Sequence, residues 1–549
     1  MRRTFDRPSM LAALRNGPEL DVLVVGGGIT GCGIALDAAT RGLRVALVER
    51  ADIASGTSST SSKLIHGGLR YLQQGDLRLV HEALLERQRL LRNAPHLVHV
   101  QPFLIPVLTK DGPVSLEIAK ALRTALWMYD LAGGLRIGRR HRRVDAAGAL
   151  AHCPTLPADR VSSGFVYYDA AADDARVTLA VARTAAEHGA IVVNRCAVVG
   201  MSKDQDGRVC GARVDVGGEQ FDVRARVVVS ATGVWADELR TLDEGRDPES
   251  IRPAKGVHVT IPWELVRNDI AVIVSVPGDK RSLFLVPWGE HGDGTFDHCY
   301  VGTTDTDHTG DLDEALTDAH DVGYLLDAIR HSLTSTISTE DVTGVWAGLR
   351  PLVRQETSSR TADLSRRHRV DVGDSGLVTV TGGKFTTYRQ MAEDTVDVVM
   401  DRLDRRGRCR TKRLRLLGAD LEPAVGNRSM LRLRQRYGSL AGELRDLIDA
   451  DPSLAGALVP GLPYVRAEAV YAVRSEMATT LVDVLARRTR AHLRDRAACL
   501  ASADEVAALL ADELGWDATE RERQVDEYRA LCEREQVAAG IAAGQEAAS

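Results

Sequence analysis

The stretch DVLVVGGGITGCGIALDAATRGLRVALVE, residues 21–49, decides how the N-terminal part of this chain folds. Residues 21–25 are a short apolar run rich in valine, and glycines follow at once. The pattern then predicts a helix over 32–41 and a second buried strand over 43–49. This order is typical of the β–turn–α–β unit of a mononucleotide-binding half, so we expect a Rossmann-like sheet to begin here.

The glycines after the first strand satisfy the GxGxxG pattern at Gly26, Gly28 and Gly31. The first glycine allows a tight turn, the second lets the backbone approach a pyrophosphate, and the third lets the helix pack close to the strand. Glu49 closes the second strand, where an acid can accept a hydrogen bond from an adenosine ribose. An acid there also repels the extra phosphate of NADP. The pattern therefore indicates a dinucleotide site.

The arrangement of later glycine turns favours FAD over NAD. A simple NAD domain would stay contiguous for about 150 residues. Here a hydroxyl-rich loop, SGTSSTSSK at 55–63, leads into LIHGGLRY at 64–71. Further glycine turns follow apolar strands at 231–233 and 382–384. Several distant turns at strand ends suit an elongated cofactor held by a discontinuous domain.

Composition excludes several classes of protein. The 549 residues predict three or four structural units of about 100–200 residues each. The charges give 70 − 76 = −6, which argues against a basic nucleic-acid binder. The eight cysteines show no CxxC or metal-ligand spacing, so we expect no disulfide scaffold, no metal site and a reducing compartment. The chain has no secretory signal pattern and no continuous apolar run of about 18 residues, which predicts a cytosolic or peripheral protein.

Motifs between about residues 20 and 500 resemble the FAD-dependent glycerol-3-phosphate dehydrogenases of the aerobic type, in the glycine-oxidase-like flavoprotein superfamily. The matching stretches include residues 26–49, TSSTSSKLIHGGLRYL (57–72), SATGVWAD (230–237), AKGVHVTIP (254–262), VGTTDTDH (301–308), GLRPLV (348–353) and TGGKFTTYR (381–389). The stretch AVYAVRSEMATTLVDVLARRTR (469–490) is similar to the C-terminal helical cap of that family.

The resemblance implies an α/β fold with a discontinuous FAD-binding Rossmann-like domain, an antiparallel-sheet substrate domain and a C-terminal α-helical domain. We expect an N-terminal extension at 1–18, an oxidoreductase region at 19–405, a helical domain at 406–535 and a disordered tail at 536–549. Within the oxidoreductase region, the FAD-binding segments are expected at about 19–80, 165–250 and 340–405. The substrate segments are expected at about 81–164 and 251–339.

The activity implied by the resemblance is oxidation of sn-glycerol 3-phosphate to dihydroxyacetone phosphate, in glycerol and glycerophospholipid catabolism. Flavin oxidation of a secondary alcohol needs a hydride acceptor and a base for the hydroxyl proton. A phosphorylated substrate also needs cations, and arginine binds phosphate bidentately. The predicted catalytic residues are His66, as the general base, and Arg350. The predicted substrate-binding residues are Arg70, Tyr71, Arg350, Arg366 and Lys384, with Arg367 or Arg360 as alternatives to Arg366.

The predicted FAD-binding residues come from four separate stretches of the chain. They are Gly26, Gly28, Gly31, Glu49, Thr57, Ser58, Ser61, Ser62, Lys63, Ala231, Thr232, Gly233, Gly382, Gly383, Lys384 and Thr386, and Thr387 is a further candidate contact.

Lysine is rare in this chain, with 8 residues against 62 arginines. Lys63, Lys255 and Lys384 fall in the motifs above, which predicts roles that a guanidinium cannot fill. Asp173 and Asp174 are expected to be structural partners of Arg176.

Residues 110–143 predict a contact with an anionic membrane surface. This segment carries eight cations and three acids, a local charge of +5, together with Trp127, Met128 and other apolar residues on a predicted helix over 115–131. The resemblance implies a membrane quinone as electron acceptor and a peripheral position on the cytoplasmic face of the inner membrane. Open alternatives are an oxygen-using glycerol-3-phosphate oxidase, an amino-acid oxidase on the same fold and a non-catalytic flavoprotein. A homodimer is one candidate assembly.

Overall fold

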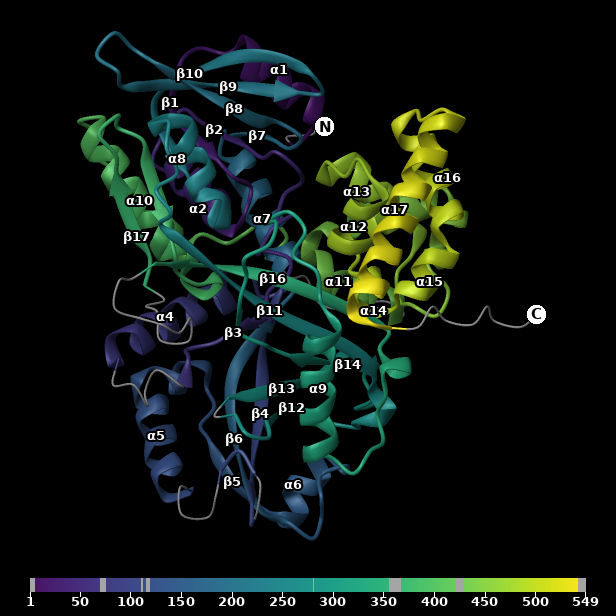
Figure 1. The fold of residues 1–549 in the computed structure, drawn as a ribbon. Coiled ribbons are helices and arrows are strands. Elements are labelled where there is room, and N and C mark those ends of the chain that lie inside the picture. Colours follow the sequence, from purple (N-terminus) through teal and green to yellow (C-terminus); the bar gives the residue numbers. More distant parts are fainter. Residues whose placement is uncertain are drawn as a thin grey trace.

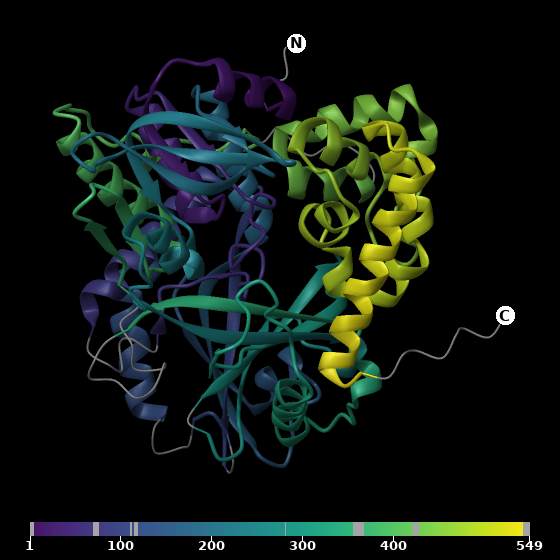
Figure 2. The same ribbon diagram turned by 45° about the horizontal axis from the view of Figure 1, so that its top comes forward.

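The computed structural model describes residues 5–69, 76–109, 112–114, 119–279, 281–354, 367–420 and 428–541. Two β-sheets lie one beyond the other, and the C-terminal helices stand beside them as a separate layer (Figure 1). A turned view shows the same three parts (Figure 2). The expected architecture of a Rossmann-like sheet, an antiparallel sheet and a helical unit is confirmed.

The first sheet has the strand order β17-β18-β10-β1-β2-β7, and β8 and β9 extend it through β10. The neighbours of β1, β2 and β10 along this order are parallel, as a nucleotide-binding sheet requires. The strands are β1 (Leu20–Val25), β2 (Val45–Val48), β7 (Ile191–Val193), β8 (Ala197–Lys203), β9 (Val209–Val216), β10 (Glu219–Ser230), β17 (Arg369–Val372) and β18 (Val378–Thr381).

Strand β1 is buried on both faces, which explains its continuous apolar run. Val22 and Val24 pack in the core that contains α2 (Ile29–Thr40), α7 (Asp174–Glu187) and α10 (Tyr388–Arg402). Leu23 and Val25 alternate to the other face and pack in the core of β8 to β10 and α1 (Arg7–Asn16).

The second sheet has the order β15-β11-β14-β13-β12-β4-β6-β3, with β16 on β11 and β5 on β6. Its pairs are antiparallel except β12 with β4. The strands are β3 (Leu64–Ile65), β4 (Val98–Leu108), β5 (Arg142–Asp145), β6 (Val161–Ala172), β11 (Ile251–Pro262), β12 (Ala271–Ser275), β13 (Ser282–Glu290), β14 (Phe296–Gly302), β15 (Thr306–Asp307) and β16 (Gly344–Val353).

Further helices pack on these two sheets. They are α4 (Leu77–Asn93), α5 (Ala119–Ala132), α6 (Ala146–His152), α8 (Ala236–Glu244) and α9 (Ala319–Ser332).

The C-terminal helical unit has its own apolar cores. Its helices are α11 (Arg428–Tyr437), α12 (Ala441–Ala450), α13 (Arg466–Glu476), α14 (Ala491–Arg494), α15 (Arg496–Ala501), α16 (Ala503–Leu514) and α17 (Ala518–Ala539).

Strands β7 and β8 are separated by Arg195, which has a left-handed backbone with φ +52°. Residues 536–541 were expected to belong to a disordered tail, but they are ordered, because α17 continues to Ala539. That residue is buried in the core of the second sheet, and Ile541 packs against the same core.

Candidate active site

A cavity of about 1220 Å³ runs between the two sheets and brings together residues from distant parts of the chain. Most residues predicted from the sequence line it. These are Gly26, Gly28, Glu49, Thr57, Ser58, Ser61, Ser62, His66, Ala231, Thr232, Gly233, Arg350, Gly382, Gly383, Lys384 and Thr386.

At one end of the cavity, the turn between β1 and α2 leaves no room for side chains. Gly26 has φ +112°, and a Cβ there would lie 2.6 Å from the carbonyl oxygen of Ala231. A Cβ at Gly31 would lie 1.9 Å from the carbonyl oxygen of Gly26, so this glycine permits close packing of α2. Helix α2 begins at Ile29 with Gly28 as its N-cap. The turn therefore presents free backbone and a helix N-terminus to a ligand's phosphates.

Glu49 is held at the edge of this turn by backbone groups. Its carboxylate accepts hydrogen bonds from the N–H groups of Gly27, at 2.6 Å, and Ala51, at 2.8 Å. Burial raises the pKa of Glu49, and the two backbone bonds oppose this effect. An acid fixed at this position fits an adenosine ribose, so the cradle and the elongated cavity together suit FAD.

The hydroxyl-rich loop at 55–63 follows the cavity wall and is anchored on several sides. Thr57 Oγ1 donates to the Leu349 carbonyl, and Ser58 Oγ accepts from the N–H of Ile29 at 2.9 Å. Ser61 donates to Asp174 through both its N–H, at 3.0 Å, and its hydroxyl, at 2.7 Å. The loop is thus bound to α2, to β16 and to α7.

Lys63 takes a different position from the predicted cofactor contact. Its backbone has φ +57°, and its side chain is buried away from the cavity lining. The ammonium lies 3.4 Å from Asp174 and 4.5 Å from the centre of the Trp346 ring. Burial, followed by the charge of Arg490, lowers the pKa of Lys63 to about 8. Asp174 therefore pairs with Lys63 and Arg490, whereas the predicted partner Arg176 pairs with Glu476.

Lys255 faces the opposite side of β11 from the cavity. Its ammonium lies 2.7 Å from Asp318 and 2.6 Å from Asp321 on or beside α9. The alternation of a strand places the neighbouring Gly256 and His258 on the cavity side. Of the three motif lysines, the structure places only Lys384 in the cavity lining.

Arg350 approaches the cavity across Gly256. A Cβ at Gly256 would lie 2.4 Å from Arg350 Nη2, so only glycine leaves room for the guanidinium. Arg350 Nη1 lies 3.3 Å from Asp305, and Nη2 donates to Thr303 Oγ1 at 3.2 Å. These partners fix the orientation of the guanidinium.

A buried polar cluster formed by Tyr129, Asp169 and Arg87 holds the loop that carries His66. The N–H of Gly67 lies 3.0 Å from Tyr129 Oη and 3.2 Å from Asp169 Oδ1. Tyr129 donates to Asp169 at 2.8 Å, and Asp169 also pairs with Arg87. A Cβ at Gly67 would lie 2.5 Å from Tyr129 Oη, so a larger residue would displace this loop.

Three predicted substrate residues, Arg70, Tyr71 and Arg366, lie outside the described residues, as does the alternative Arg360. The other alternative, Arg367, is half exposed and pairs with Asp76 at 3.0 Å. Thr387 is buried, and its hydroxyl donates to the Lys384 carbonyl at 3.3 Å.

Sequence reasoning missed His258 and Asp305. His258 is buried in the cavity wall, where its Nε2 lies 2.8 Å from Ser62 Oγ and its ring stacks on Trp346. Burial, then the charges of Lys63 and Arg350, lowers the pKa of His258 well below its usual value, so the ring is neutral. Strand alternation within AKGVHVTIP could have indicated this residue.

An apolar arm of the same cavity extends toward α5. It is lined by Phe103, Ile105, Pro113, Val114, Leu122, Ile273 and Phe284.

Helix α5 has one buried and one exposed apolar face. Leu122, Leu126 and Tyr129 are buried, as the predicted helix required. Trp127, Met128 and Leu131 are 41%, 44% and 72% exposed. The same segment of the chain carries exposed cations at Lys120, Arg123, Arg136, Arg139, Arg140, Arg142 and Arg143. Within the described residues, no helix is long and apolar enough to cross a membrane.

Comparison with known proteins agrees with this geometry. Residues 21–397 match the family of FAD dependent oxidoreductases, and residues 409–521 match the C-terminal domain of alpha-glycerophosphate oxidase. The chain is 41% identical to glycerol-3-phosphate dehydrogenase 2 of Mycobacterium tuberculosis over 533 residues, which cover 94% of this chain and 88% of that protein. This chain belongs to the FAD-dependent glycerol-3-phosphate dehydrogenase family.

More distant relatives also match over most of this chain. The mitochondrial glycerol-3-phosphate dehydrogenase of Mus musculus is 37% identical, with 96% of this chain and 75% of that protein covered. The structure of the Bacillus halodurans glycerol-3-phosphate dehydrogenase complexed with FAD superposes with a TM-score of 0.78 at 27% identity, covering 100% of both chains. The cofactor of this FAD-dependent dehydrogenase is FAD.

Proposed function

We propose that this dehydrogenase oxidises sn-glycerol 3-phosphate to dihydroxyacetone phosphate, in glycerol and glycerophospholipid catabolism. The observation that carries the proposal is the convergence of His66, Arg350 and Lys384 on a cavity that also holds the glycine turn and hydroxyl loop. The names of the relatives above support the same substrate.

His66, Arg350 and Lys384 suit the two demands of the reaction, which are removal of the hydroxyl proton and binding of the phosphate. FAD, when bound, supplies the hydride acceptor. The imidazole of His66 accepts the hydroxyl proton of the substrate as general base. Arg350, oriented by Asp305, binds the phosphate or the developing oxyanion, and Lys384 contributes a second cation. We propose the same substrate role for Arg70, Tyr71 and Arg366.

The cofactor is proposed to lie along the first sheet. The glycine turn and the N-terminus of α2 hold its pyrophosphate, and Glu49 holds its adenosine ribose. The hydroxyl loop and the turns at 231–233 and 382–384 hold the remaining length. The domain division expected from the sequence stays part of this proposal, except that residues 536–541 are ordered.

The experiment that tests the activity is anaerobic reduction of the bound flavin. Glycerol 3-phosphate, added without oxygen to the purified holoenzyme, should bleach the visible flavin absorption, and dihydroxyacetone phosphate should form in equal amount. Glycerol, which lacks the phosphate, is the matched control. An unchanged flavin spectrum with glycerol 3-phosphate would overturn the proposal.

We also propose a membrane quinone as the electron acceptor and an anionic membrane surface as the docking site. The apolar arm of the cavity suits an apolar acceptor, and it ends beside α5, whose exposed residues are those expected of an interfacial helix. Reoxidation of the bleached enzyme by a short-chain quinone analogue should be at least ten times faster than by dissolved oxygen. Faster reoxidation by oxygen would favour an oxidase instead.

A further inference from the structure

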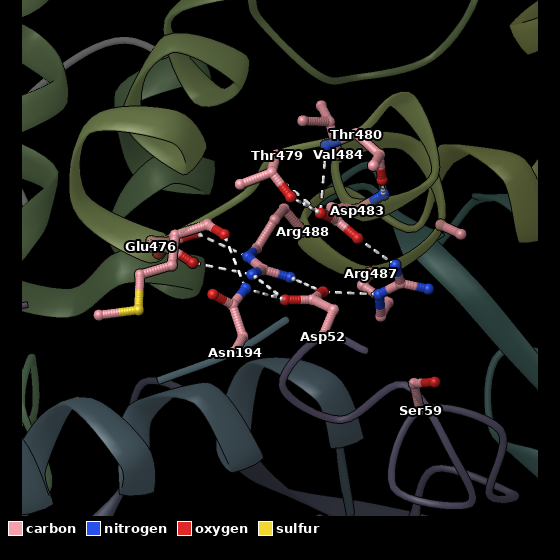
Figure 3. A network of polar contacts seen from close by, with 12 residues as sticks. Asp52, Ser59, Asn194, Glu476, Thr479, Thr480, Asp483, Val484, Arg487 and Arg488 are labelled. Carbon is pink, nitrogen blue, oxygen red and sulfur yellow. Dashed lines mark hydrogen bonds and ion pairs between the residues drawn. The ribbon is translucent and has the colours of Figure 1, made fainter. Parts of the chain in front are cut away.

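A buried polar interface joins the C-terminal helical unit to the start of the cofactor-binding loop (Figure 3). Asp52, which is fully buried, accepts from Arg487 Nε at 2.6 Å and from both terminal nitrogens of Arg488 at 2.7 and 2.8 Å. Asp52 lies on the loop that leads to Ser59, and the two arginines approach it from a π-helical turn, Asp483–Arg488. Such turns are rare and are frequently found at functional sites.

Arg490 follows this turn and reaches the hydroxyl loop itself. Its side chain is 1% exposed, and its backbone has φ +71°. Arg490 Nη2 donates to the carbonyl oxygen of Ser59 and to Asp174 Oδ1, the latter at 2.6 Å. Its Nε lies 3.4 Å from Asp173.

Asp174 connects this arginine to the cavity wall. Its other oxygen, Oδ2, accepts both the N–H and the hydroxyl of Ser61, a residue that lines the cavity. One carboxylate therefore binds Arg490 on one side and the loop backbone on the other. Arg490 therefore holds the loop at Ser59, and Asp174 holds it at Ser61. Both residues lie far from the loop in the sequence.

The chemistry of these contacts favours arginine. A guanidinium is a planar fork that can bind a carbonyl and two carboxylates at once, whereas an ammonium is a compact point charge. Lys63 already donates to the same two atoms, the Ser59 carbonyl at 3.3 Å and Asp174 Oδ1 at 3.4 Å, so a second ammonium would not replace the fork. Removal of the Asp174 carboxylate would leave two buried cations, Arg490 and Lys63, without this shared partner.

We propose that Arg490 is a positioning residue that sets the hydroxyl loop against FAD, which makes the C-terminal helical unit necessary for cofactor retention. The inference rests on the proposed placement of FAD in the cavity. It extends the role of the C-terminal unit beyond packing, since its contact is with the loop that lines the site.

The test compares full-length holoenzymes that carry Arg490→Lys, Asp174→Asn or Arg183→Lys. Arg183 is a matched control, because it is buried in the same interface but binds Glu476 and Tyr471 in the C-terminal unit. The readouts are the rate of FAD release, followed by the rise in flavin fluorescence on dilution, and amide hydrogen exchange in a peptide covering 55–63. We expect FAD release at least tenfold faster in Arg490→Lys and Asp174→Asn, with faster exchange in that peptide. Arg183→Lys should stay within twofold of wild type.

The outcomes separate this inference from the cofactor placement. Gly28→Val fills the glycine turn and should abolish FAD retention; if it keeps FAD like wild type, the placement fails and the inference fails with it. If Gly28→Val loses FAD but Arg490→Lys and Arg183→Lys release it at equal rates, only the role of Arg490 is overturned. If Arg490→Lys does not fold, Asp174→Asn decides, because it breaks the same link from the other side. If the double variant of Arg490→Lys and Asp174→Asn releases FAD no faster than either single variant, this would support the two residues acting together as one link to the loop.

Discussion

At the scale of single residues, the position of the loop that carries His66 depends on the buried hydrogen bonds of its neighbour Gly67. Gly67, Tyr129 and Asp169 form one buried cluster, and Tyr129 belongs to α5 rather than to the first sheet. The loop that carries His66 is therefore oriented by a helix whose opposite face is exposed. Because a buried hydrogen-bond network acts as a unit, loss of one hydroxyl should shift the loop without unfolding the protein.

Tyr129→Phe tests this cluster. The substitution leaves the Gly67 N–H and Asp169 without the hydroxyl, so we expect kcat for glycerol 3-phosphate to fall about tenfold, equivalent to about 1.4 kcal/mol. FAD content should be unchanged, since Tyr129 is remote from the glycine turn. Steady-state kinetics and the flavin absorbance ratio measure the two effects. Tyr471→Phe, which removes a buried hydroxyl in the C-terminal unit, is the control and should leave kcat within twofold. Equal kcat values for Tyr129→Phe and wild type would contradict the role of the cluster.

At the scale of elements, helix α5 packs one face against the protein and exposes the other face to solvent. The buried face of α5 matches its apolar period, and the exposed face carries Trp127, Met128 and Leu131 beside arginines. Exposed apolar side chains within a basic surface are typical of a membrane contact.

Neutralising four of these arginines should release the protein from membranes. Arg139, Arg140, Arg142 and Arg143, changed together to Gln, should lower cosedimentation with phosphatidylglycerol vesicles, because each cation near an anionic surface contributes about 1 kcal/mol. The expected weakening is at least 100-fold at low salt. The control changes four other exposed arginines, Arg406, Arg408, Arg410 and Arg413, in the same way. If both quadruple variants cosediment equally, the basic residues 139–143 that follow α5 are not part of the contact.

The contact between α14 and α17 should make the stability of the C-terminal unit depend on pH. His492 Nε2 lies 2.9 Å from Glu535, and its Nδ1 lies 2.9 Å from Tyr528 Oη. Burial alone would lower the pKa of His492, but the charge of Glu535 together with hydrogen bonds to Cys532 and Glu535 raises it to about 10. A raised pKa contributes stability that is fully present below about pH 6.5, the unfolded value, and is lost as pH rises through 10.

The measurement is the melting temperature of wild type and His492→Gln between pH 6 and pH 10. The difference in melting temperature should be largest near pH 6 and shrink toward pH 10. This corresponds to a loss of stabilisation by His492 on the order of a few kcal/mol. A difference that stays constant across this range would show that His492 does not hold an extra proton in the folded state.

At the scale of the whole molecule, the site exists only where separate units meet. The cavity wall combines the first sheet, the second sheet and the loop that Arg490 and Arg488 bind from the C-terminal unit. FAD should therefore act as a ligand that holds these units together.

Removal of FAD should lower the stability of the entire protein rather than of one unit. A ligand at 100 times its dissociation constant adds about 2.7 kcal/mol, so the holoenzyme should melt a few degrees higher than the flavin-free protein. Differential scanning calorimetry with and without added FAD measures the shift, and added NAD is the control ligand. Equal melting temperatures for the two forms would contradict a cofactor that bridges the units.

The sequence by itself determined the first sheet, the cofactor class and most of the cavity lining. These features depend on local patterns, such as the Gly26 to Gly31 turn and the apolar run of β1, whose physical cause lies within a few residues. The rarity of lysine was a weaker guide, because only Lys384 of the three motif lysines lines the cavity.

Only the tertiary structure decided which side each polar residue faces and what it binds. Strand alternation turned Lys255 toward α9 and His258 toward the cavity, and the left-handed backbone at Lys63 turned its side chain to Asp174. The link from Arg490 to the hydroxyl loop spans more than 400 residues of sequence. No local pattern encodes such a contact, because it forms only when packed units bring opposite charges together away from water.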